Sequence, residues 1–539
     1  MMKRLLWLTA LSLLSMTLSA SDSLRVHNPN VPILLDRFDN VLFKIRVPDA
    51  KPGDVLESVT VEFDVATDLK SIAELRLFYS GTESARSQGL RFSPVEYISA
   101  HNVWNTRSAN PSYSTLQEQT SKIGRKVDLH SRQPMVEGIN YYWVSVMMEP
   151  DASLLTELGA RVTGIVINGN MVPFACDTCD VIRRVGYGVR HAGDDHSMAY
   201  RIPGLVTTNS GTLIGVYDVR WNSSVDLQER VDIGVSRSTD KGQTWEPMRL
   251  AMSFADAGGL PSGQNGVGDP AVLVDERTGT VWVVAVWTHG MGNGRAWTNS
   301  MPGMDPGETP QLMLVRSDDD GRSWSKPINI TRQVKNPSWC FLLQGPGRGI
   351  TMRDGTLVFA VQFIDKDRMP HAGIMYSKDH GETWHIHNPA RSNTTEAQVA
   401  EVEPGVLMLN MRDNRGGSRA VMTTRDLGQT WTEHVSHRTS LREPVCMASL
   451  IAVPARKNVL GKDILLFSNP DTIDGRHDIT IKASLDGGAT WPYKLLLDEG
   501  DSWGYSCLTM IDSQTVDILY ESSAAHIAFQ AVRLEDIVK

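Results

Sequence analysis

Five copies of one short motif constrain the fold of this chain more than any other feature. Each copy reads S/T-x-D-x-G-x-T/S-W and matches all five specified positions. The copies span residues 238–245, 317–324, 377–384, 424–431 and 484–491. Five such matches do not arise by chance in one chain, so these five boxes mark a structural repeat. They also account for five of the 14 Trp residues, which outnumber the 12 Tyr and the 12 Phe.

The chemistry of a box predicts the turn of a β-hairpin. Asp and Ser/Thr side chains hydrogen-bond nearby backbone groups, and Gly supplies a positive φ. The terminal Trp is expected to turn inward as a large apolar plug. Alternating or β-branched runs precede most boxes, among them 231–235, 312–315 and 479–481. We therefore interpret the boxes as structural turns, which indicate an architecture but no activity.

The spacing of the boxes predicts a β-propeller. They start 79, 60, 47 and 60 residues apart, and a four-stranded blade takes about 40 to 50 residues. Each of five blades thus carries one box, with insertions. Four strand-like runs outside these blades complete a sixth and close the ring: 182–189, 506–511, 516–520 and 527–534. The expected domain is a six-bladed propeller over residues 181–539.

Residues 21–180 contain no box and are expected to form a separate all-β sandwich. Strand-like runs punctuated by turn residues are typical of that fold. The runs are 41–47, 59–65, 75–79, 141–147 and 162–167.

Residues 1–20 have the form of a secretory signal peptide. Lys3 and Arg4 precede a mostly apolar run over 5–18, and small residues follow it. The run is too short to span a bilayer of about 30 Å, which disfavours a retained anchor. We expect an exported protein that is periplasmic, cell-surface-associated or extracellular.

Composition excludes two classes of partner. The chain has a net charge of -9 and a pI of about 5.9, so it lacks the broad cationic face of a nucleic-acid binder or a membrane-surface protein. The five Cys residues form no disulfide framework. Cys176 and Cys179 form a lone CxxC, which predicts a bridge or two free thiols and no zinc site. No cofactor or metal is expected.

The segment Tyr200-Arg201-Ile202-Pro203-Gly204, together with the boxes, resembles the bacterial exo-sialidase (neuraminidase) family, whose first blade opens with a Phe/Tyr-Arg-Ile-Pro motif. The resemblance covers roughly residues 185–539. It implies a glycoside hydrolase that acts on terminal sialic acids of glycans. The amino-terminal sandwich is similar to the β-rich domain that precedes the propeller in several such enzymes. That similarity implies glycan binding, although a purely structural role is equally open.

The family's pattern assigns candidate residues to two tasks. Three arginines hold the substrate carboxylate, and by their local motifs they correspond to Arg201, Arg412 and Arg476. The nucleophile is a tyrosine with a glutamate beside it, matched here by Tyr505 and Glu396.

The remaining candidates lie in the first two blades. Asp226, 25 residues after Arg201, matches the acid/base, although Asp218 and Asp232 lie nearby in the sequence. Arg220 and Asp269 resemble the family's contacts to sugar hydroxyls.

The substrate explains these residue types. A sialic acid carries a carboxylate on its anomeric carbon, and guanidinium groups hold a carboxylate through charge-assisted hydrogen bonds. That carboxylate would repel an anionic nucleophile, whereas a neutral phenol avoids the repulsion, and sialidases are known to use a Tyr nucleophile. A phenol with an ordinary pKa near 10 needs a neighbouring base.

Two alternative functions stay open for the same fold. The first is an intramolecular trans-sialidase or another sialyl transfer, which differs only in whether water reaches the intermediate. The second is a non-catalytic lectin, which has no need of Tyr505 with Glu396.

The large insertion between the first two boxes, from Trp287 to Pro310, is either a disordered loop or a rim that contacts the aglycone.

Overall fold

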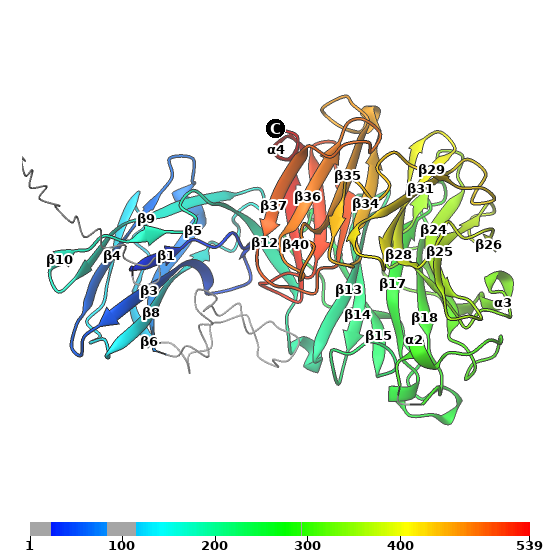
Figure 1. Cartoon of the computed structure of the whole chain (residues 1–539), viewed down its shortest axis with the longest axis horizontal. Helices are drawn as coiled ribbons and strands as arrows, with labels where there is room; N and C mark the ends of the chain where they lie inside the picture. Colours follow the sequence, from blue (N-terminus) through cyan, green and yellow to red (C-terminus); the bar gives the residue numbers. More distant parts are fainter. Residues whose placement is uncertain (1–22, 83–114, 293) are drawn as a thin grey trace, which may run out of the picture.

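Two β-rich lobes lie side by side along the long axis of the molecule, the amino-terminal one drawn in blue and cyan (Figure 1). This computed structural model describes residues 23–82, 115–292 and 294–539. The segment expected to be a signal peptide lies outside the described residues. In these described ranges strands make up nearly all the regular structure, and the α-helices there, α2 (Ala296–Asn299), α3 (Thr331–Val334) and α4 (Leu534–Ile537), have four residues each. The expected all-β class is confirmed.

The amino-terminal lobe is a sandwich of two sheets. One sheet has the strand order β11-β1-β3-β8-β5-β6, and the other contains β9, β4 and β7. Along β4, Val59, Val61 and Phe63 are buried in the core while the residues between them face outward, as a half-buried strand requires. The strands are β1 (Arg25–His27), β3 (Asn40–Ala50), β4 (Leu56–Phe63), β5 (Ile72–Gly81), β6 (Thr115–Thr120), β7 (Lys126–His130), β8 (Gly138–Met148), β9 (Glu157–Ile167), β10 (Asn170–Met171) and β11 (Ala175–Cys176).

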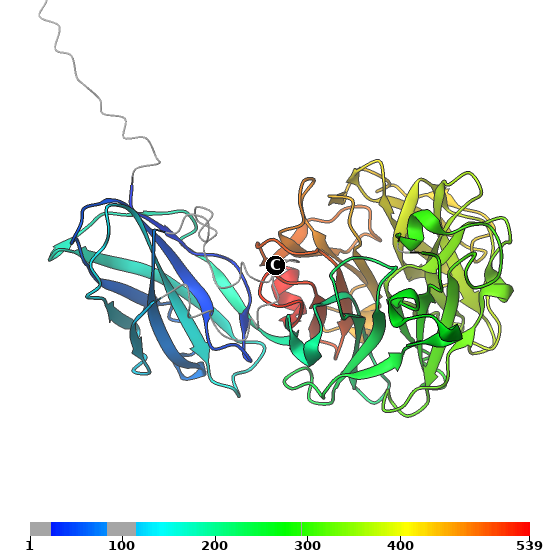
Figure 2. The ribbon, with the colours of Figure 1, turned by 90° about the horizontal axis from the view of Figure 1, so that it is seen from below.

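The carboxyl-terminal lobe contains six units of four antiparallel strands. They are β38-β39-β40-β12, β13-β14-β15-β16, β17-β18-β19-β20, β21-β24-β25-β26, β28-β29-β31-β32 and β34-β35-β36-β37. The inner strand β13 contacts β17 of the unit that follows it and β38 of the unit that precedes it in this order. In Figure 2 the colours accordingly run round the lobe from teal through green and yellow to red.

The first three units supply the following strands: β12 (Ile182–Arg190), β38 (Ser506–Met510), β39 (Thr515–Tyr520), β40 (Ile527–Arg533), β13 (Ala199–Thr207), β14 (Leu213–Arg220), β15 (Val231–Ser238), β16 (Arg249–Met252), β17 (Val267–Val274), β18 (Val281–Trp287), β19 (Gln311–Ser317) and β20 (Ile328–Asn329). The other three supply β21 (Phe341–Gln344), β24 (Leu357–Ile364), β25 (Pro370–Ser377), β26 (His385–Ile386), β28 (Thr394–Glu403), β29 (Val406–Asp413), β31 (Ala420–Thr424), β32 (Thr432–Glu433), β34 (Ser449–Val453), β35 (Ile464–Pro470), β36 (Ile479–Ser484) and β37 (Tyr493–Asp498). Short additional strands, β22 (Gly347–Arg348), β23 (Ile350–Thr351), β27 (Arg391–Ser392), β30 (Gly417–Ser418) and β33 (Arg442–Glu443), pair at the edges.

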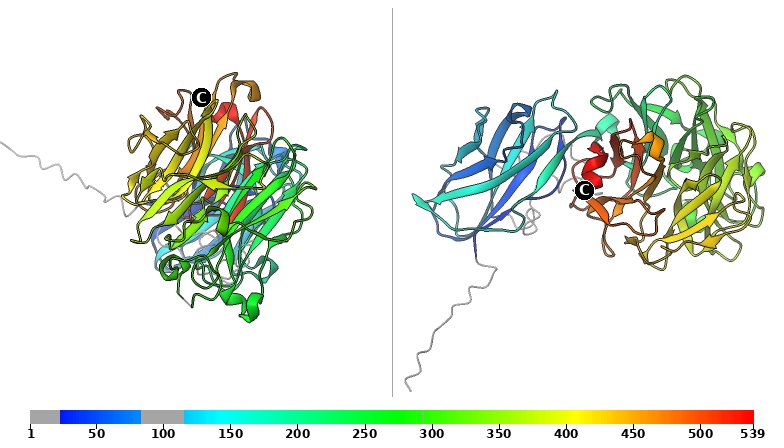
Figure 3. Two further views of the ribbon diagram at one scale, coloured as in Figure 1. Left: turned by 90° about the vertical axis from the view of Figure 1, so that its right-hand side faces the viewer. Right: turned by 90° about the horizontal axis from the view of Figure 1, so that it is seen from above.

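Strand β12 belongs to both lobes. Its first residues, from Ile182 to Arg184, pair with β9 of the sandwich, and the stretch from Gly186 to Arg190 pairs with β40. The short strand β2 (Ile33–Leu34) pairs with the middle of β12. One sheet therefore runs through both lobes, and the red carboxyl-terminal strands face the sandwich (Figure 3). The expected division at residue 180 stays a prediction. It falls just before β12, the strand through which the sheet continues from one lobe into the other.

Each box forms the turn between the third and fourth strands of its unit. In the box that follows β19, the Ser317 hydroxyl accepts from Gly321 N at 2.8 Å and donates to Asp319, whose carboxylate also accepts from Ser323 N at 2.8 Å. The box glycines all have positive φ, 76° at Gly321. The expected Trp plug is only partly correct: Trp384 and Trp491 are buried, whereas the other three box tryptophans are half-buried.

Two negative findings apply to residues 23–82, 115–292 and 294–539. No helix there combines the length and hydrophobicity of a membrane span. All five cysteines lie in this part of the chain and are free thiols, so of the two expectations for Cys176 and Cys179 the structure has the unbridged one.

Candidate active site

The inner strands of the propeller bring the candidate residues together at their amino-terminal ends. Arg201 lies near the start of β13, Asp269 near the start of β17, Glu396 near the start of β28 and Tyr505 directly before β38. A pocket of about 350 Å³ opens at this end. Its walls include Asp226, Asp269, Glu396, Arg412 and Tyr505. Residues up to 300 positions apart in the chain thus converge on one cavity.

Tyr505, Glu396 and Arg412 form one hydrogen-bonded group in this pocket. The Tyr505 hydroxyl donates to Glu396 Oε1. Arg412 Nη1 donates to Glu396 Oε2 at 2.6 Å and approaches the Tyr505 oxygen at 3.3 Å. The arrangement places an acceptor for the phenolic proton and a cation for the resulting phenolate around one oxygen.

The free pocket keeps the Tyr505 phenol neutral. Burial and the charge of Glu396 raise the pKa of Tyr505 well above its ordinary value, and Arg412 opposes them only in part. Burial lowers the pKa of Arg412, but Glu396 outweighs it and raises that pKa above its ordinary value. The phenol therefore loses its proton only when a neighbouring group such as Glu396 accepts it or when binding changes its surroundings.

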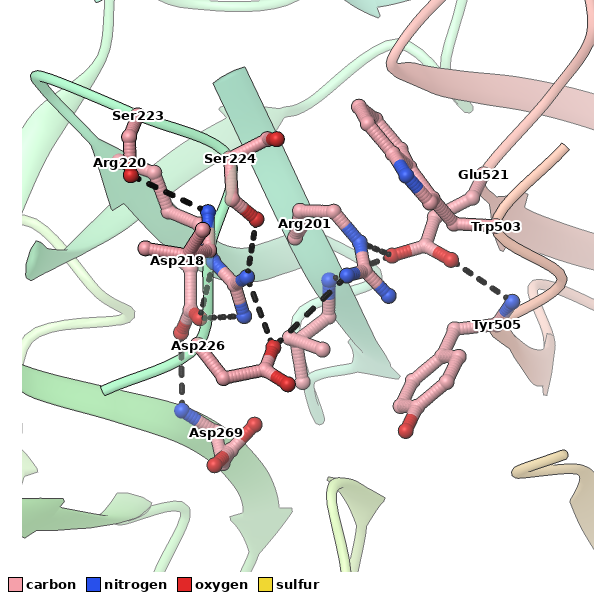
Figure 4. Close-up of polar contacts among 12 residues, drawn as sticks. Arg201, Asp218, Arg220, Ser223, Ser224, Asp226, Asp269, Trp503, Tyr505 and Glu521 are labelled. Carbon is pink, nitrogen blue, oxygen red and sulfur yellow. Dashed lines mark hydrogen bonds and ion pairs between the residues drawn. The ribbon is translucent and has the colours of Figure 1, made fainter. Parts of the chain in front are cut away.

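Glu521 is a site residue that the motifs did not reveal. It accepts from Arg201 Nε at 2.7 Å, from Ile202 N at 3.0 Å and from Tyr505 N at 2.9 Å, and it is fully buried (Figure 4). One carboxylate thus fixes Arg201 and Tyr505 relative to each other. A signal existed in the sequence, because Glu521 directly follows the apolar end of strand β39, Ile518–Tyr520.

The other two arginines flank the same phenol ring. The Arg201 guanidinium lies 5.3 Å from the Tyr505 ring centre and 4.9 Å from that of Trp503 (Figure 4). Arg476 lies 5.8 Å from the Tyr505 ring and donates to the Trp503 carbonyl at 3.0 Å. Together with Arg412, the expected three arginines surround Tyr505.

Asp226 faces Tyr505 from another wall of the pocket. It accepts from Arg220 Nη1 at 2.9 Å and lies 3.9 Å from Arg201 Nη1 (Figure 4). Burial raises the pKa of Asp226, but Arg220 and Arg201 outweigh it and lower that pKa below its ordinary value. Its side chain is 57% exposed, so a substrate has access to it.

The neighbouring acids are less available than Asp226. Asp218 is buried and accepts from Arg220 at 2.9 Å and from Asp269 N at 2.8 Å. Asp232 is buried and accepts from the Trp221 indole at 2.7 Å. Arg220 therefore links Asp218 to Asp226.

Asp269 supplies a second kind of carboxyl group. Burial, followed by the charge of Asp218, raises the pKa of Asp269 well above its ordinary value. A carboxyl group with a raised pKa retains its proton more readily, and in that form it can donate a hydrogen bond to a sugar hydroxyl. Asp269 and Ile202 both have positive φ, 57° and 62°. This conformation is strained for the β-branched Ile202, and such strain is typical of functional sites.

The large insertion forms part of the rim. Helix α2 carries Arg295 at its start and Trp297 within it, and both line the pocket. Ala296 N donates to Leu227 O at 2.9 Å, next to Asp226, and the Trp297 ring packs edge-on against Phe341 at 5.9 Å. The sequence predicts for the insertion either a disordered loop or a rim that contacts the aglycone. Its described residues around α2 are ordered and line the pocket, which favours the rim.

No group of three or more His, Cys, Asp or Glu side chains in the described ranges is placed to hold a metal ion.

Two family descriptions match the chain. "N-terminal domain of BNR-repeat neuraminidase" matches residues 21–171, and "BNR repeat-like domain" matches residues 219–518. A sialidase of Bacteroides fragilis (strain YCH46) is 60% identical over 524 residues, which cover 96% of each chain. The chain belongs to the sialidase family. The expected enzyme class, a glycoside hydrolase of the sialidase type, is confirmed.

Solved structures agree with this assignment. The Hadza microbial sialidase Hz136 is 85% identical with a TM-score of 0.92, over 95% of this chain and all of that one. Trypanosoma rangeli sialidase, at 23% identity and a TM-score of 0.52 over 64% of this chain and 55% of that one, supports the fold alone. The propeller preceded by a sandwich is thereby confirmed as the fold of this sialidase.

Proposed function

We propose that this sialidase removes terminal sialic acids from glycoproteins, glycolipids and oligosaccharides with retention, through a covalent sialyl-tyrosine intermediate. The observation that supports this most directly is the hydrogen bond from Tyr505 to Glu396 inside an arginine-lined pocket. Family membership supports sialosides as the substrate class.

In the proposed Michaelis complex, Arg201, Arg412 and Arg476 hold the substrate carboxylate. A guanidinium fork matches a carboxylate and keeps its charge at every working pH. The bound carboxylate partly neutralises Arg201, which in the free pocket lowers the pKa of Asp226. Substrate binding therefore raises that pKa and favours the protonated form that an acid catalyst needs.

In the first displacement, Tyr505 attacks the anomeric carbon while Glu396 takes the phenolic proton. Asp226 donates its proton to the leaving glycosidic oxygen. In the second displacement, Asp226 deprotonates a water that attacks the same carbon, and the phenol regains its proton from Glu396. Two inversions give net retention.

Release of the fluorophore from an aryl sialoside tests hydrolysis. Tyr505→Phe should lower kcat at least about 10³-fold, since it removes the nucleophile, whereas Tyr493→Phe on the outer strand β37 should leave kcat unchanged. A Tyr505→Phe variant that kept near-normal turnover would refute the nucleophile assignment.

The covalent step and its stereochemistry need direct observation. A fluorinated sialoside that leaves quickly but hydrolyses slowly should add one sialyl group to a peptide containing Tyr505, as seen by mass spectrometry. NMR should show the α-anomer of sialic acid as the first product. A first-formed β-anomer, or labelling elsewhere, would exclude the proposed route.

The same NMR experiment addresses the two alternatives. An anhydro sugar or a transferred sialoside as the main product would replace hydrolysis by sialyl transfer. Binding without any product would indicate a lectin.

We further propose that the chain is exported and that the sandwich binds glycans. The basic and apolar pattern of residues 1–20 supports export, and the match of the sandwich to a neuraminidase amino-terminal domain supports its association with the catalytic lobe. Fractionation of cells, and glycan binding by the Tyr505→Phe enzyme with the pocket blocked by a sialic acid analogue, test the two points.

A further inference from the structure

A second pocket lies at the opposite end of the propeller from the active site. The inner strands begin at the catalytic pocket and end at this one: Ile202 of β13 lines the first and Thr207 the second. Five residues of strand separate the two by roughly 16 Å. The second pocket has a volume of about 610 Å³, within the range of small-molecule sites.

The charge of this pocket is opposite to that of the whole protein. Five cationic side chains and three carboxylates line it, a net charge of +2 in a chain of net charge -9. The cationic side chains are Arg277, Arg348, Arg353, Arg456 and Lys457, and the carboxylates are Glu276, Glu401 and Asp512.

The three carboxylates are already engaged. Glu276 pairs with Lys457 at 3.2 Å, and Asp512 pairs with Lys241, outside the pocket, at 3.0 Å. Glu401 accepts from the backbone of Arg353 at 2.8 Å and of Gly405 at 2.9 Å. Among the described residues, Arg277, Arg348 and Arg456 form no ion pair, so three guanidinium groups in one cavity lack a counter-anion.

Arg348 lies at the centre of this arrangement. It extends from β22 across the ring to β38, where its Nη1 donates to Leu508 O and to Thr509 Oγ1, each at 3.2 Å. These contacts to neutral oxygens fix the guanidinium but leave its charge uncompensated. Burial lowers the pKa of Arg348 below its ordinary value, and the charges of Cys507 and Glu276 oppose this only in part.

We propose that this pocket binds an oxyanion, either free or carried by a sugar, with Arg348 as the central contact and Arg277 and Arg456 at its border. Guanidinium groups recognise sulfate, phosphate and carboxylate through paired hydrogen bonds. The hydroxyls of Thr207 and Thr509, 3.2 Å apart at the same end, add neutral hydrogen-bonding groups beside the guanidinium. The volume exceeds that of a single oxyanion and leaves room for a monosaccharide that bears one.

Titration calorimetry of the full chain with sodium sulfate, at constant ionic strength, tests the site. Arg348→Gln should weaken sulfate binding about tenfold or more, and Arg456→Gln should weaken it several-fold. Arg456 is exposed, and its side chain forms no hydrogen bond or ion pair with the described residues, so its variant is informative even if Arg348→Gln fails to fold. Arg161→Gln in the sandwich makes the same charge change and should leave binding intact.

The source of the anion is distinguished by a second ligand. Glucose 6-sulfate binding at least tenfold tighter than sulfate, with glucose itself inert, would support a sugar-borne anion, and equal or weaker binding would support a free one. Absence of saturable sulfate binding to the wild type would overturn the proposal. The proposal would also be overturned if sulfate bound Arg348→Gln as tightly as wild type and inhibited sialoside hydrolysis competitively. The anion would then occupy the catalytic arginines.

Discussion

Single carboxylates determine how the arginines of the catalytic pocket are oriented. Glu521 fixes Arg201, and Glu396 fixes Arg412, each by a hydrogen bond of 2.6–2.7 Å to one edge of the guanidinium. The positions are therefore set before substrate arrives, which reduces the ordering that binding requires.

Glu521→Gln should disorganise the first arginine and the nucleophile together. An amide cannot accept from Ile202 N and Tyr505 N at both ends, and it leaves the Arg201 charge buried without its partner. We expect kcat/KM to fall by about 10- to 100-fold, since a hydrogen bond to a charged group contributes about 1.5–3 kcal/mol. Affinity for sialic acid and turnover should both decline. Glu382→Gln, on an exposed ion pair, is the matched control. Unchanged affinity for sialic acid would contradict the positioning role.

Arg295→Ala should extend activity to higher pH. Arg295 Nη1 lies 4.0 Å from Asp226 and is one of the cations that lower its pKa. Removing a cation raises the pKa of a carboxyl group, so the protonated acid persists to higher pH and the basic limb of the kcat profile moves upward. The profile is measured with a sialyl oligosaccharide, whose poor leaving group needs an acid. Arg332→Ala, an exposed arginine paired with Asp305, should leave the limb in place. A downward shift of the limb in Arg295→Ala would be incompatible with this role.

At the scale of elements, each box stabilises the turn that follows the third strand of its unit. Their hydrogen bonds join residues two to four positions apart, and so they form without help from distant parts of the chain. Four of the five box tryptophans donate their indole N–H to a backbone carbonyl, three of them to the glycine of their own box.

Asp319→Asn should destabilise the protein at neutral pH and lose that effect in acid. Hydrogen bonds from Ser323 lower the pKa of Asp319 to about 2 from an ordinary 3.8. A depressed pKa contributes stability above the unfolded value, and this contribution disappears as the pH falls from about 4 to about 2. We expect a loss of about 1 kcal/mol in the free energy of unfolding at pH 6, because one accepting oxygen is removed.

Urea unfolding of both proteins at pH 6, 4 and 3 measures this difference. Asp318→Asn, the adjacent exposed carboxylate outside the five specified motif positions, is the control. A difference between Asp319→Asn and wild type that stays constant with pH would show that the carboxylate charge is not what the turn uses.

The same distinction between local and distant contacts explains what the sequence could predict. Patterns of only a few residues encode the boxes, the strands on both sides of them and the motif around Arg201. The sequence therefore predicts all three. The role of Glu521 depends on three backbone segments that meet only when the ring closes. The exposure of three box tryptophans likewise depends on the neighbouring blade.

At the scale of the whole molecule, the two lobes are joined by more than a linker. Strand β12 pairs with β9 on one side and β40 on the other, and β2 from the amino-terminal lobe pairs with its middle. A pattern of strand-like runs shows where strands lie but not that one strand serves two sheets.

Asp36 is a buried contact of this junction and predicts how the lobes unfold. Its carboxylate accepts from Gly188 N at 2.8 Å and lies 2.7 Å from His191 Nε2, so it ties the amino-terminal segment to β12 and to the residue after it. Asp36→Ala leaves both groups without this acceptor, which costs about 2–4 kcal/mol. Since β12 is shared, we expect calorimetry to show one transition at a lower Tm for both lobes.

Asp128→Ala, on strand β7 at the end of the sheet away from β12, should change Tm little. If the sandwich instead melted first in Asp36→Ala while the propeller kept its normal Tm, the shared sheet would not couple the lobes, and the sandwich would be an independent domain.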